Sequence, residues 1–178
     1  MSQTELFCLA FPKLERAQEA RLTRWCSRYD PERSARVAPH FTIGFGGAGI
    51  GEDLFFEHVK QIAGSTRTID FTCRRAVVGT DHQSHQGFVF LIPDEGNGAL
   101  YALHERMYGG ILEPHRRLDI PFKPHITVAN TKDLQRACAI TEEINAEGFT
   151  LLGEVSALSV VAVYRDGSVK VRETVSLG

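Results

Sequence analysis

The stretch that decides the fold is Pro121-Phe122-Lys123-Pro124-His125-Ile126-Thr127-Val128-Ala129, and it has an echo upstream in Ala38-Pro39-His40-Phe41-Thr42-Ile43-Gly44. Both contain proline, histidine, an apolar residue, threonine and a β-branched residue in that order. Proline is tolerated at the first residue of a strand, and β-branched residues favour strands. Each stretch therefore predicts a strand that begins next to its histidine.

Strand geometry decides which side chains of the motifs lie together. Residues i and i+2 of a strand point to the same face of the sheet. His40 and Thr42 therefore share one face, as do His125 and Thr127, and the apolar residues between them face the other way. The pattern predicts two strands that pack a core with one face and present an imidazole beside a hydroxyl on the other.

The rest of the chain alternates between helical and extended patterns. Asp30-Pro31 and Gly148 are stop signals for helices, and Asn97 is a suitable N-cap. The glycine-rich stretch 44–51 does not fit a dinucleotide-binding fingerprint, and we expect a loop at the mouth of the site. We expect helices at 14–29, 53–63, 97–111 and 133–146, strands at 6–11, 68–78, 88–92, 150–152, 156–164 and 169–176, and hairpin links at 79–87 and 165–168.

Composition limits the classes of function. The chain has 178 residues, of which 43% are hydrophobic and 24% charged, and its net charge is −2. These values are typical of one globular domain over 1–178 without a basic tail for nucleic acid. The excess of basic residues in 13–36 indicates either a solvated helix face or a rim that faces phosphate. Near-neutral charge favours a short substrate over long RNA.

The expected cellular compartment is inferred from three sequence features: apolar runs, the first residues and the cysteines. No apolar run is long enough to span a bilayer, and the first residues do not resemble a signal peptide. The four cysteines are scattered without a Cys-x-x-Cys motif. We expect a cytoplasmic, reduced protein that does not associate with membranes and is a monomer.

Two His-x-Thr motifs half a chain apart resemble the two-histidine (2H) phosphoesterase superfamily, and in particular its 2′-5′ RNA ligase-like and RNA 2′,3′-cyclic phosphodiesterase members. The early strand that ends before Pro12, the strand Phe88–Leu91 and the helix around Leu103-His104 extend the resemblance over most of the chain. It implies an α+β fold of two pseudo-twofold lobes. Each lobe would have an antiparallel sheet with helices packed outside, and the two motifs would face each other across a central cleft.

The resemblance also implies a mechanism, which the chemistry of the residues supports. Opening a cyclic phosphate needs a base to deprotonate water and an acid to protonate the departing ribose oxygen. Two histidines can fill both roles because their ordinary pKa lies near neutrality. We therefore predict His40, Thr42, His125 and Thr127 as catalytic residues, with no metal or cofactor, and a bell-shaped pH profile with a maximum at about pH 6–7. By resemblance, His40 is the base and His125 the acid.

Other residues are candidates for binding the substrate. Lys123 lies two residues before His125 and is predicted to share its face, either as a phosphate ligand or as a solvated lysine. Phe122 is either a stacking platform for a base or a core residue. The pairs Arg74-Arg75 and Arg116-Arg117 are either rim contacts for RNA or ordinary surface. The expected partner is an RNA 3′ end or a small nucleotide with a cyclic phosphate.

Three further interpretations remain open. The same site can run as a 2′-5′ RNA ligase or open an ADP-ribose cyclic phosphate. The chain can instead be a non-catalytic module that binds nucleotides or RNA. A metal hydrolase built on His82 and His85 is the third alternative, although no other ligand accompanies them at suitable spacing. His104 follows an apolar helical stripe and is predicted to be structural.

Overall fold

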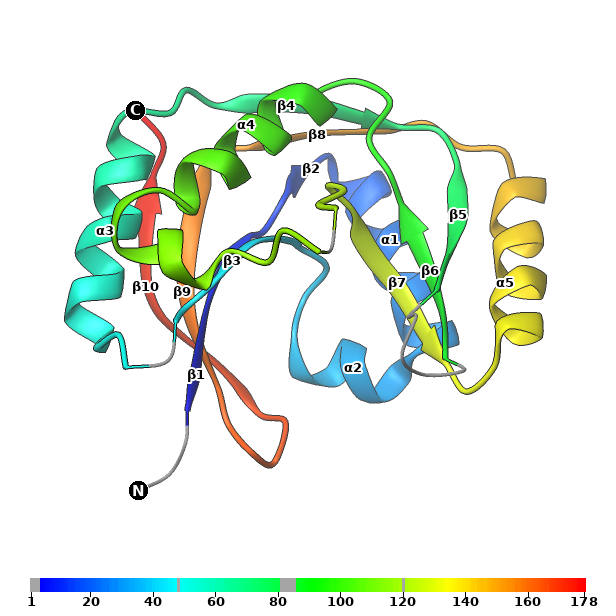
Figure 1. Cartoon of the computed structure of the whole chain (residues 1–178). Helices are drawn as coiled ribbons and strands as arrows, with labels where there is room; N and C mark the ends of the chain where they lie inside the picture. The colour runs from blue at the N-terminus through cyan, green and yellow to red at the C-terminus, as the bar shows by residue number, and fades with distance from the viewer. Residues whose placement is uncertain (1–3, 48, 81–85, 120) are drawn as a thin grey trace.

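A computed structural model describes residues 4–47, 49–80, 86–119 and 121–178 of the protein. Its centre is a seven-stranded antiparallel sheet with the strand order β10-β9-β1-β3-β7-β6-β5, and a three-stranded sheet, β2-β8-β4, lies at one end of it (Figure 1). The large sheet comprises β1 (Glu5–Ala10), β3 (Phe41–Phe45), β5 (Ala76–Thr80), β6 (Gly87–Leu91), β7 (Ile126–Thr131), β9 (Ala157–Val163) and β10 (Val169–Ser176). The small sheet comprises β2 (Lys13–Leu14), β4 (Ile69–Cys73) and β8 (Leu151–Val155).

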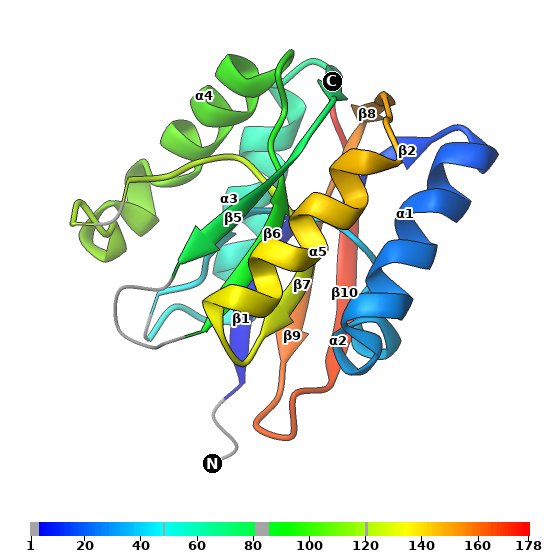
Figure 2. The ribbon, with the colours of Figure 1, turned by 90° about the vertical axis from the view of Figure 1, so that its right-hand side faces the viewer.

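Helices cover the two halves of the large sheet from outside. α3 packs against β10, β9 and β1, and α4 packs against β3, whereas α1 and α5 lie side by side over the β5–β7 half (Figures 1 and 2). The helices are α1 (Arg16–Tyr29), α2 (Pro31–Arg36), α3 (Glu52–Gly64), α4 (Asn97–Met107) and α5 (Leu134–Ala146), with a 3₁₀ helix at Gly110–His115. The expected α+β class with antiparallel sheets is confirmed.

The two halves of the sheet meet at a narrow joint between the motif strands. β3 and β7 are antiparallel neighbours, but only Phe41 and Ile126 are paired as Cα partners. Both of these side chains are buried, as the alternation of the motifs predicts. The sequence predicts a separate sheet for each lobe, whereas the structure continues one sheet through both halves.

α2 lies beside the part of β7 that is not paired with β3. Asp30 caps this helix by accepting a hydrogen bond from the Arg33 amide, and its other carboxylate oxygen accepts one from the Asn130 amide at 3.0 Å. The Arg33 guanidinium donates to the Thr127 carbonyl oxygen at 2.9 Å. Side chains from α2 and its cap therefore satisfy backbone groups of β7 that lack a strand partner at this point.

Several local predictions are wrong. The helix expected at 97–111 ends at Met107, and the helix expected from residue 14 begins at Arg16, after the short strand β2. The stretch 68–78 is not one strand, because the chain turns at Arg74-Arg75 and its two parts, β4 and β5, enter different sheets. Asn97 is not the N-cap of α4, which begins after Gly96 with a φ of 79°. A side chain at Gly96 would meet the carbonyl oxygen of Asp70 at 2.3 Å, so close packing against β4 requires a glycine at this position.

Other boundaries agree with the stop and cap signals. Asp30 ends α1, although the short helix α2 that starts at Pro31 was not predicted. Gly148, with a φ of 58°, follows the end of α5, and Gly167, with a φ of 76°, allows the tight turn between β9 and β10. Within the described ranges, no helix has both the length and the apolar character required to cross a bilayer.

Candidate active site

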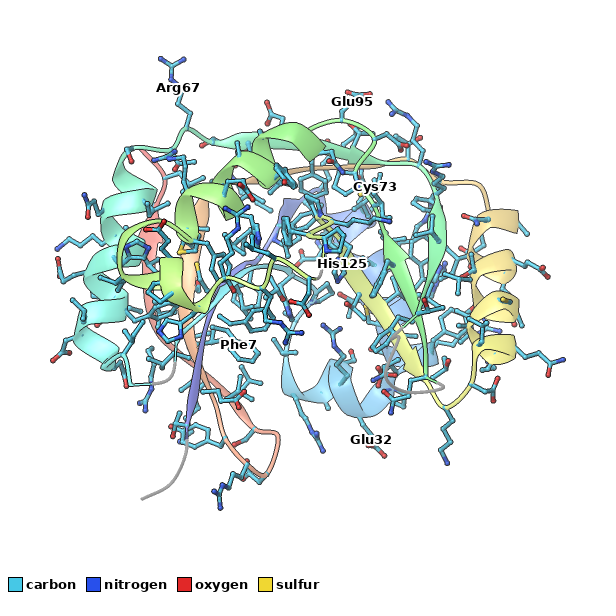
Figure 3. The ribbon with its side chains drawn as sticks, viewed as in Figure 1. Phe7, Glu32, Arg67, Cys73, Glu95 and His125 are labelled. Atoms are coloured by element: carbon cyan, nitrogen blue, oxygen red, sulfur yellow. The ribbon has the colours of Figure 1, made fainter. Side chains whose placement is uncertain are left out.

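The register of the motif strands brings all four predicted catalytic side chains to one face. Phe41 is the Cα partner of Ile126 in antiparallel register. Extending this register by one residue in each direction puts His40 opposite Thr127 and Thr42 opposite His125. Opposed residues of neighbouring strands point to the same side of a sheet. In this register the two histidines lie diagonally across the strand pair, and so do the two threonines. Figure 3 shows His125 in the middle of the molecule, where the two halves of the sheet meet.

His40 is the more buried of the two histidines, with 7% of its surface exposed. Its Nδ1 lies 2.7 Å from the carbonyl oxygen of Ala38, and the edge of Phe11 packs against its ring. The pKa of His40 is lowered to about 4, mainly by burial and in addition by the charges of Arg33 and His125, while the hydrogen bond to Ala38 opposes the shift.

His125 repeats the same arrangement on the second strand. Its Nδ1 lies 2.7 Å from the carbonyl oxygen of Lys123, and its ring centroid lies 4.0 Å from that of Phe90. Burial lowers the pKa of His125, the hydrogen bond to Lys123 opposes this shift, and the charge of Arg33 adds to it.

These contacts fix the tautomer of both rings. A carbonyl oxygen only accepts hydrogen bonds, so each Nδ1 must carry the hydrogen. In the neutral imidazole, Nε2 of His40 and of His125 is then the unprotonated nitrogen. Each Nε2 can take up a proton as a base, or donate one when its ring is charged.

Arg33 is the residue near this site that sequence reasoning missed. Its guanidinium holds the Thr127 carbonyl oxygen and its charge acts on both histidines. The excess of basic residues in 13–36 was the only signal in the sequence, and it could not distinguish Arg33 from the others. Arg24 and Arg28, by contrast, form ion pairs with Glu147 and Glu143 of the loop after α5 and of α5 itself.

A cavity of about 520 Å³ opens on one side of the motif residues, and His40 and Thr127 do not line it. Thr42 and His125 line it together with an apolar, largely aromatic wall that includes Phe45, which is 50% exposed, and Tyr108. His104 and Phe122 also line it and stack on each other, with centroids 3.6 Å apart and planes inclined by 3°. The Nδ1 of His104 also lies 2.9 Å from the Ile43 carbonyl oxygen of β3, which agrees with the structural role that we expected.

The predicted substrate contacts are divided between this cavity and other parts of the surface. Lys123 and Phe122 both line the cavity, and Lys123 is exposed. Arg116 and Arg117 also line it, but each is paired with a carboxylate, of Glu105 and Asp119 respectively. Arg74 and Arg75 lie between β4 and β5, do not line the cavity and pair with Asp94 and Glu95.

In the part of the chain that the structure describes, the remaining histidines give no sign of a metal site. His58 bonds through Nε2 to the Met107 carbonyl oxygen, and His115 lines the cavity. His82 and His85, on which the metal-hydrolase alternative rests, lie outside the described residues. In the described ranges, no three side chains of His, Cys, Asp or Glu are grouped so that they could hold an ion.

Comparison with known proteins identifies the family. A model of the 2′-5′ RNA ligase superfamily matches residues 12–167, which include both motifs. The chain belongs to the 2′-5′ RNA ligase superfamily. This agrees with the resemblance to 2H phosphoesterases that the motifs indicated. No curated protein matches the chain.

Solved structures of other proteins share the fold of this superfamily member. The protein TT0787 of Thermus thermophilus is 21% identical over 97% of each chain, with a TM-score of 0.65. E. coli LigT in complex with 3′-AMP is 16% identical over 98% of each chain, with a TM-score of 0.57. Usb1 of Kluyveromyces marxianus is 11% identical over 99% of each chain, with a TM-score of 0.59. At these identities the likeness establishes the fold.

Proposed function

We propose that the protein is a metal-independent phosphoesterase that opens 2′,3′-cyclic phosphates of nucleotides or RNA ends. The observation that carries this proposal is the arrangement of two histidines and two threonines on one face, with both Nδ1 atoms committed to backbone carbonyls. A pair of free Nε2 atoms beside two hydroxyls suits a reaction that needs one base, one acid and donors for phosphate oxygens.

The reaction balances with these groups alone. His40 Nε2 accepts a proton from water as the water oxygen forms a bond to phosphorus. The bond from phosphorus to the 2′ or 3′ oxygen breaks, and the protonated Nε2 of His125 donates its proton to that oxygen. Thr42 and Thr127 donate hydrogen bonds to the non-bridging oxygens, where charge develops. The product is a ribose monophosphate ester, and the two histidines have exchanged protonation states.

The cavity beside Thr42 and His125 suggests how the nucleoside would bind. Its volume of about 520 Å³ and aromatic lining suit a nucleobase and ribose, and base stacking on an aromatic ring is tolerant of sequence. We assign Phe122 to the base and Lys123 to a phosphate or ribose oxygen. The presence of 3′-AMP in a LigT crystal supports a nucleotide ligand in this fold.

A panel of 2′,3′-cyclic mononucleotides, with the product identified as the 2′- or 3′-phosphate, tests this function. We expect turnover by the wild type and its loss in His40→Gln and His125→Gln, with effects that are far from additive because the two residues act as a unit. His58→Gln is the matched control, since this imidazole also bonds to a carbonyl but lines no part of the cavity. Equal rates in all four proteins would contradict the proposal.

The alternatives give different results in the same assay. Joining of RNA ends or turnover of an ADP-ribose cyclic phosphate alone would assign another substrate to the same histidines. Binding without turnover would indicate the non-catalytic module. Loss of activity in a chelator, restored by a divalent metal, would indicate the metal hydrolase.

The assignment of His40 as the base and His125 as the acid is tested with a substrate whose leaving group departs without protonation. Replacing the acid then costs little, whereas replacing the base still costs the full amount. We expect His125→Ala to be the tolerant variant on this substrate. Tolerance of His40→Ala would reverse the assignment.

A further inference from the structure

Arg33 lies in an unusual position for an arginine, at the point where the two motif strands separate. It comes from α2, and its Nη1 donates to the Thr127 carbonyl oxygen at 2.9 Å. The carboxylate of Asp30 is near it but is committed to two backbone amides, those of Arg33 itself and Asn130. Within the described ranges, Arg33 forms no ion pair with a carboxylate, in contrast to Arg24 and Arg28 of the preceding helix.

The charge of Arg33 reaches both candidate catalytic histidines. It lowers the pKa of His40, together with burial and the charge of His125, and it lowers the pKa of His125, together with burial. The other groups that face these rings are the aromatic rings of Phe11 and Phe90 and two backbone carbonyls, and the exposed ammonium of Lys123 lines the same cavity as His125. Arg33 is thus the one cation of the described chain that acts on both imidazoles.

We propose that Arg33 is a positioning residue of the two-histidine site, which fixes the backbone of Thr127 and sets the pH range in which the two imidazoles share one proton. The proposal rests on the function proposed above, because it assigns Arg33 to that same site. It follows from one hydrogen bond and one effect of charge. The hydrogen bond holds β7 where β3 is no longer paired with it, and the positive charge, which forms no ion pair in the described ranges although Asp30 lies near it, disfavours protonation of both rings at once.

This role predicts a specific effect of neutralising Arg33. In Arg33→Gln, the side chain can still donate a hydrogen bond but carries no charge, so protonation of both imidazoles becomes easier. We expect the NMR titration midpoints of His40 and His125 to move to higher pH by about half a unit or more. The rising limb of kcat/KM should move in the same direction, so that kcat/KM on the acid side of this limb, at about pH 3.5, falls by about 3-fold or more.

Two further variants serve as controls. Arg33→Lys keeps the charge but loses the planar fork, so we expect a reduced rate with titration midpoints close to those of the wild type. Arg36→Gln removes one positive charge from the same helix, but Arg36 is exposed and does not shift the pKa of either histidine. We expect no change in either midpoint for this variant. Assignments of the imidazole signals come from His40→Gln and His125→Gln.

The results separate this proposal from the proposed function. The imidazole titration requires no substrate, so it tests Arg33 even if no cyclic phosphate is turned over, in which case the proposed function alone fails. Midpoints that stay unchanged in Arg33→Gln would show that Arg33 only supports the fold. If Arg33→Gln does not fold, a midpoint shift of half a unit or more in the charge-preserving Arg33→Lys overturns the proposal.

Discussion

At the scale of single residues, backbone carbonyls determine what each imidazole can do. Ala38 and Lys123 each accept a hydrogen bond from the Nδ1 of the histidine two residues later. The proline between them, Pro39 or Pro124, has no amide hydrogen and a fixed φ, and so restricts the backbone that presents this carbonyl. The proline of the motif thus contributes to the chemistry as well as to the start of the strand.

The pH profile is the first prediction at this scale. In the free enzyme, His40 must be neutral to act as a base, and its pKa is lowered to about 4, so kcat/KM should rise near pH 4. His125 must be protonated to act as an acid, and its lowered pKa puts the falling limb below pH 6.5. The optimum of kcat/KM therefore lies below the pH of 6–7 that the sequence alone predicts. A profile with both limbs above pH 7 would contradict the assigned protonation states.

The threonine hydroxyls give the second prediction. Thr42→Val and Thr127→Val keep the shape of the side chain but remove a donor to phosphate oxygens, so kcat should fall by about 10–10³-fold. Thr131→Val in the same strand is the control, because its hydroxyl bonds to the carbonyl oxygens of Gly87 and Asp133. This control should lose stability and keep the kcat of the folded fraction. Unchanged rates in both motif variants would show that the two hydroxyls do not contribute to catalysis.

At the scale of secondary structure elements, close packing between backbones restricts which residue can occupy some positions. A side chain at Gly87 of β6 would meet the Cβ of Ala137 at 2.6 Å and the carbonyl oxygen of Asp133 at 2.8 Å. Backbone at the start of α5 cannot move aside as a flexible side chain can. Gly87→Ala should therefore destabilise the protein by about 1–3 kcal/mol, as measured by urea denaturation.

Gly98 provides the matched control for this prediction. It lies exposed in the first turn of α4 with no atom within 4 Å of an added Cβ. Gly98→Ala should stabilise the protein by about 0.4–1 kcal/mol, because alanine has less freedom to lose on folding. Equal effects of the two substitutions would show that the packing of β6 against α5 is not the reason for a glycine at position 87.

Local patterns in the sequence predict most elements but not their partners. Alternation of apolar residues correctly predicted that Phe41 and Ile126 face the core. The pairing of these two residues with each other depends on contacts across 85 positions, which no local pattern encodes. For the same reason, the strand at 68–78 was not recognised as two strands of different sheets, and Arg33 could not be separated from neighbouring arginines. In each of these cases, contacts with residues distant in the sequence determine the structure.

At the scale of the whole molecule, the buried His40 couples protonation to folding. Its pKa is about 4 in the folded state, against an ordinary value near 6.5, so the unfolded chain binds the proton more tightly. The contribution of this residue to stability is therefore fully present above pH 6.5 and is lost as pH falls towards 4. The loss amounts to about 3 kcal/mol in that window.

His40→Gln isolates this contribution from that of the carboxylates. The free energy of unfolding of the wild type should fall more steeply between pH 6.5 and 4 than that of the variant, as measured by urea denaturation at each pH. Parallel curves for the two proteins would mean that the imidazole is protonated at the same pH in the folded and unfolded states.

The single residue pair that joins β3 to β7 has a consequence for the temperature dependence of activity. One histidine belongs to each half of the large sheet, so a small change in the angle between the halves alters the separation of the imidazoles. Heating should loosen this joint before it melts either half. Turnover should therefore decline at temperatures where circular dichroism still reports native helix and sheet, and it should return fully on cooling.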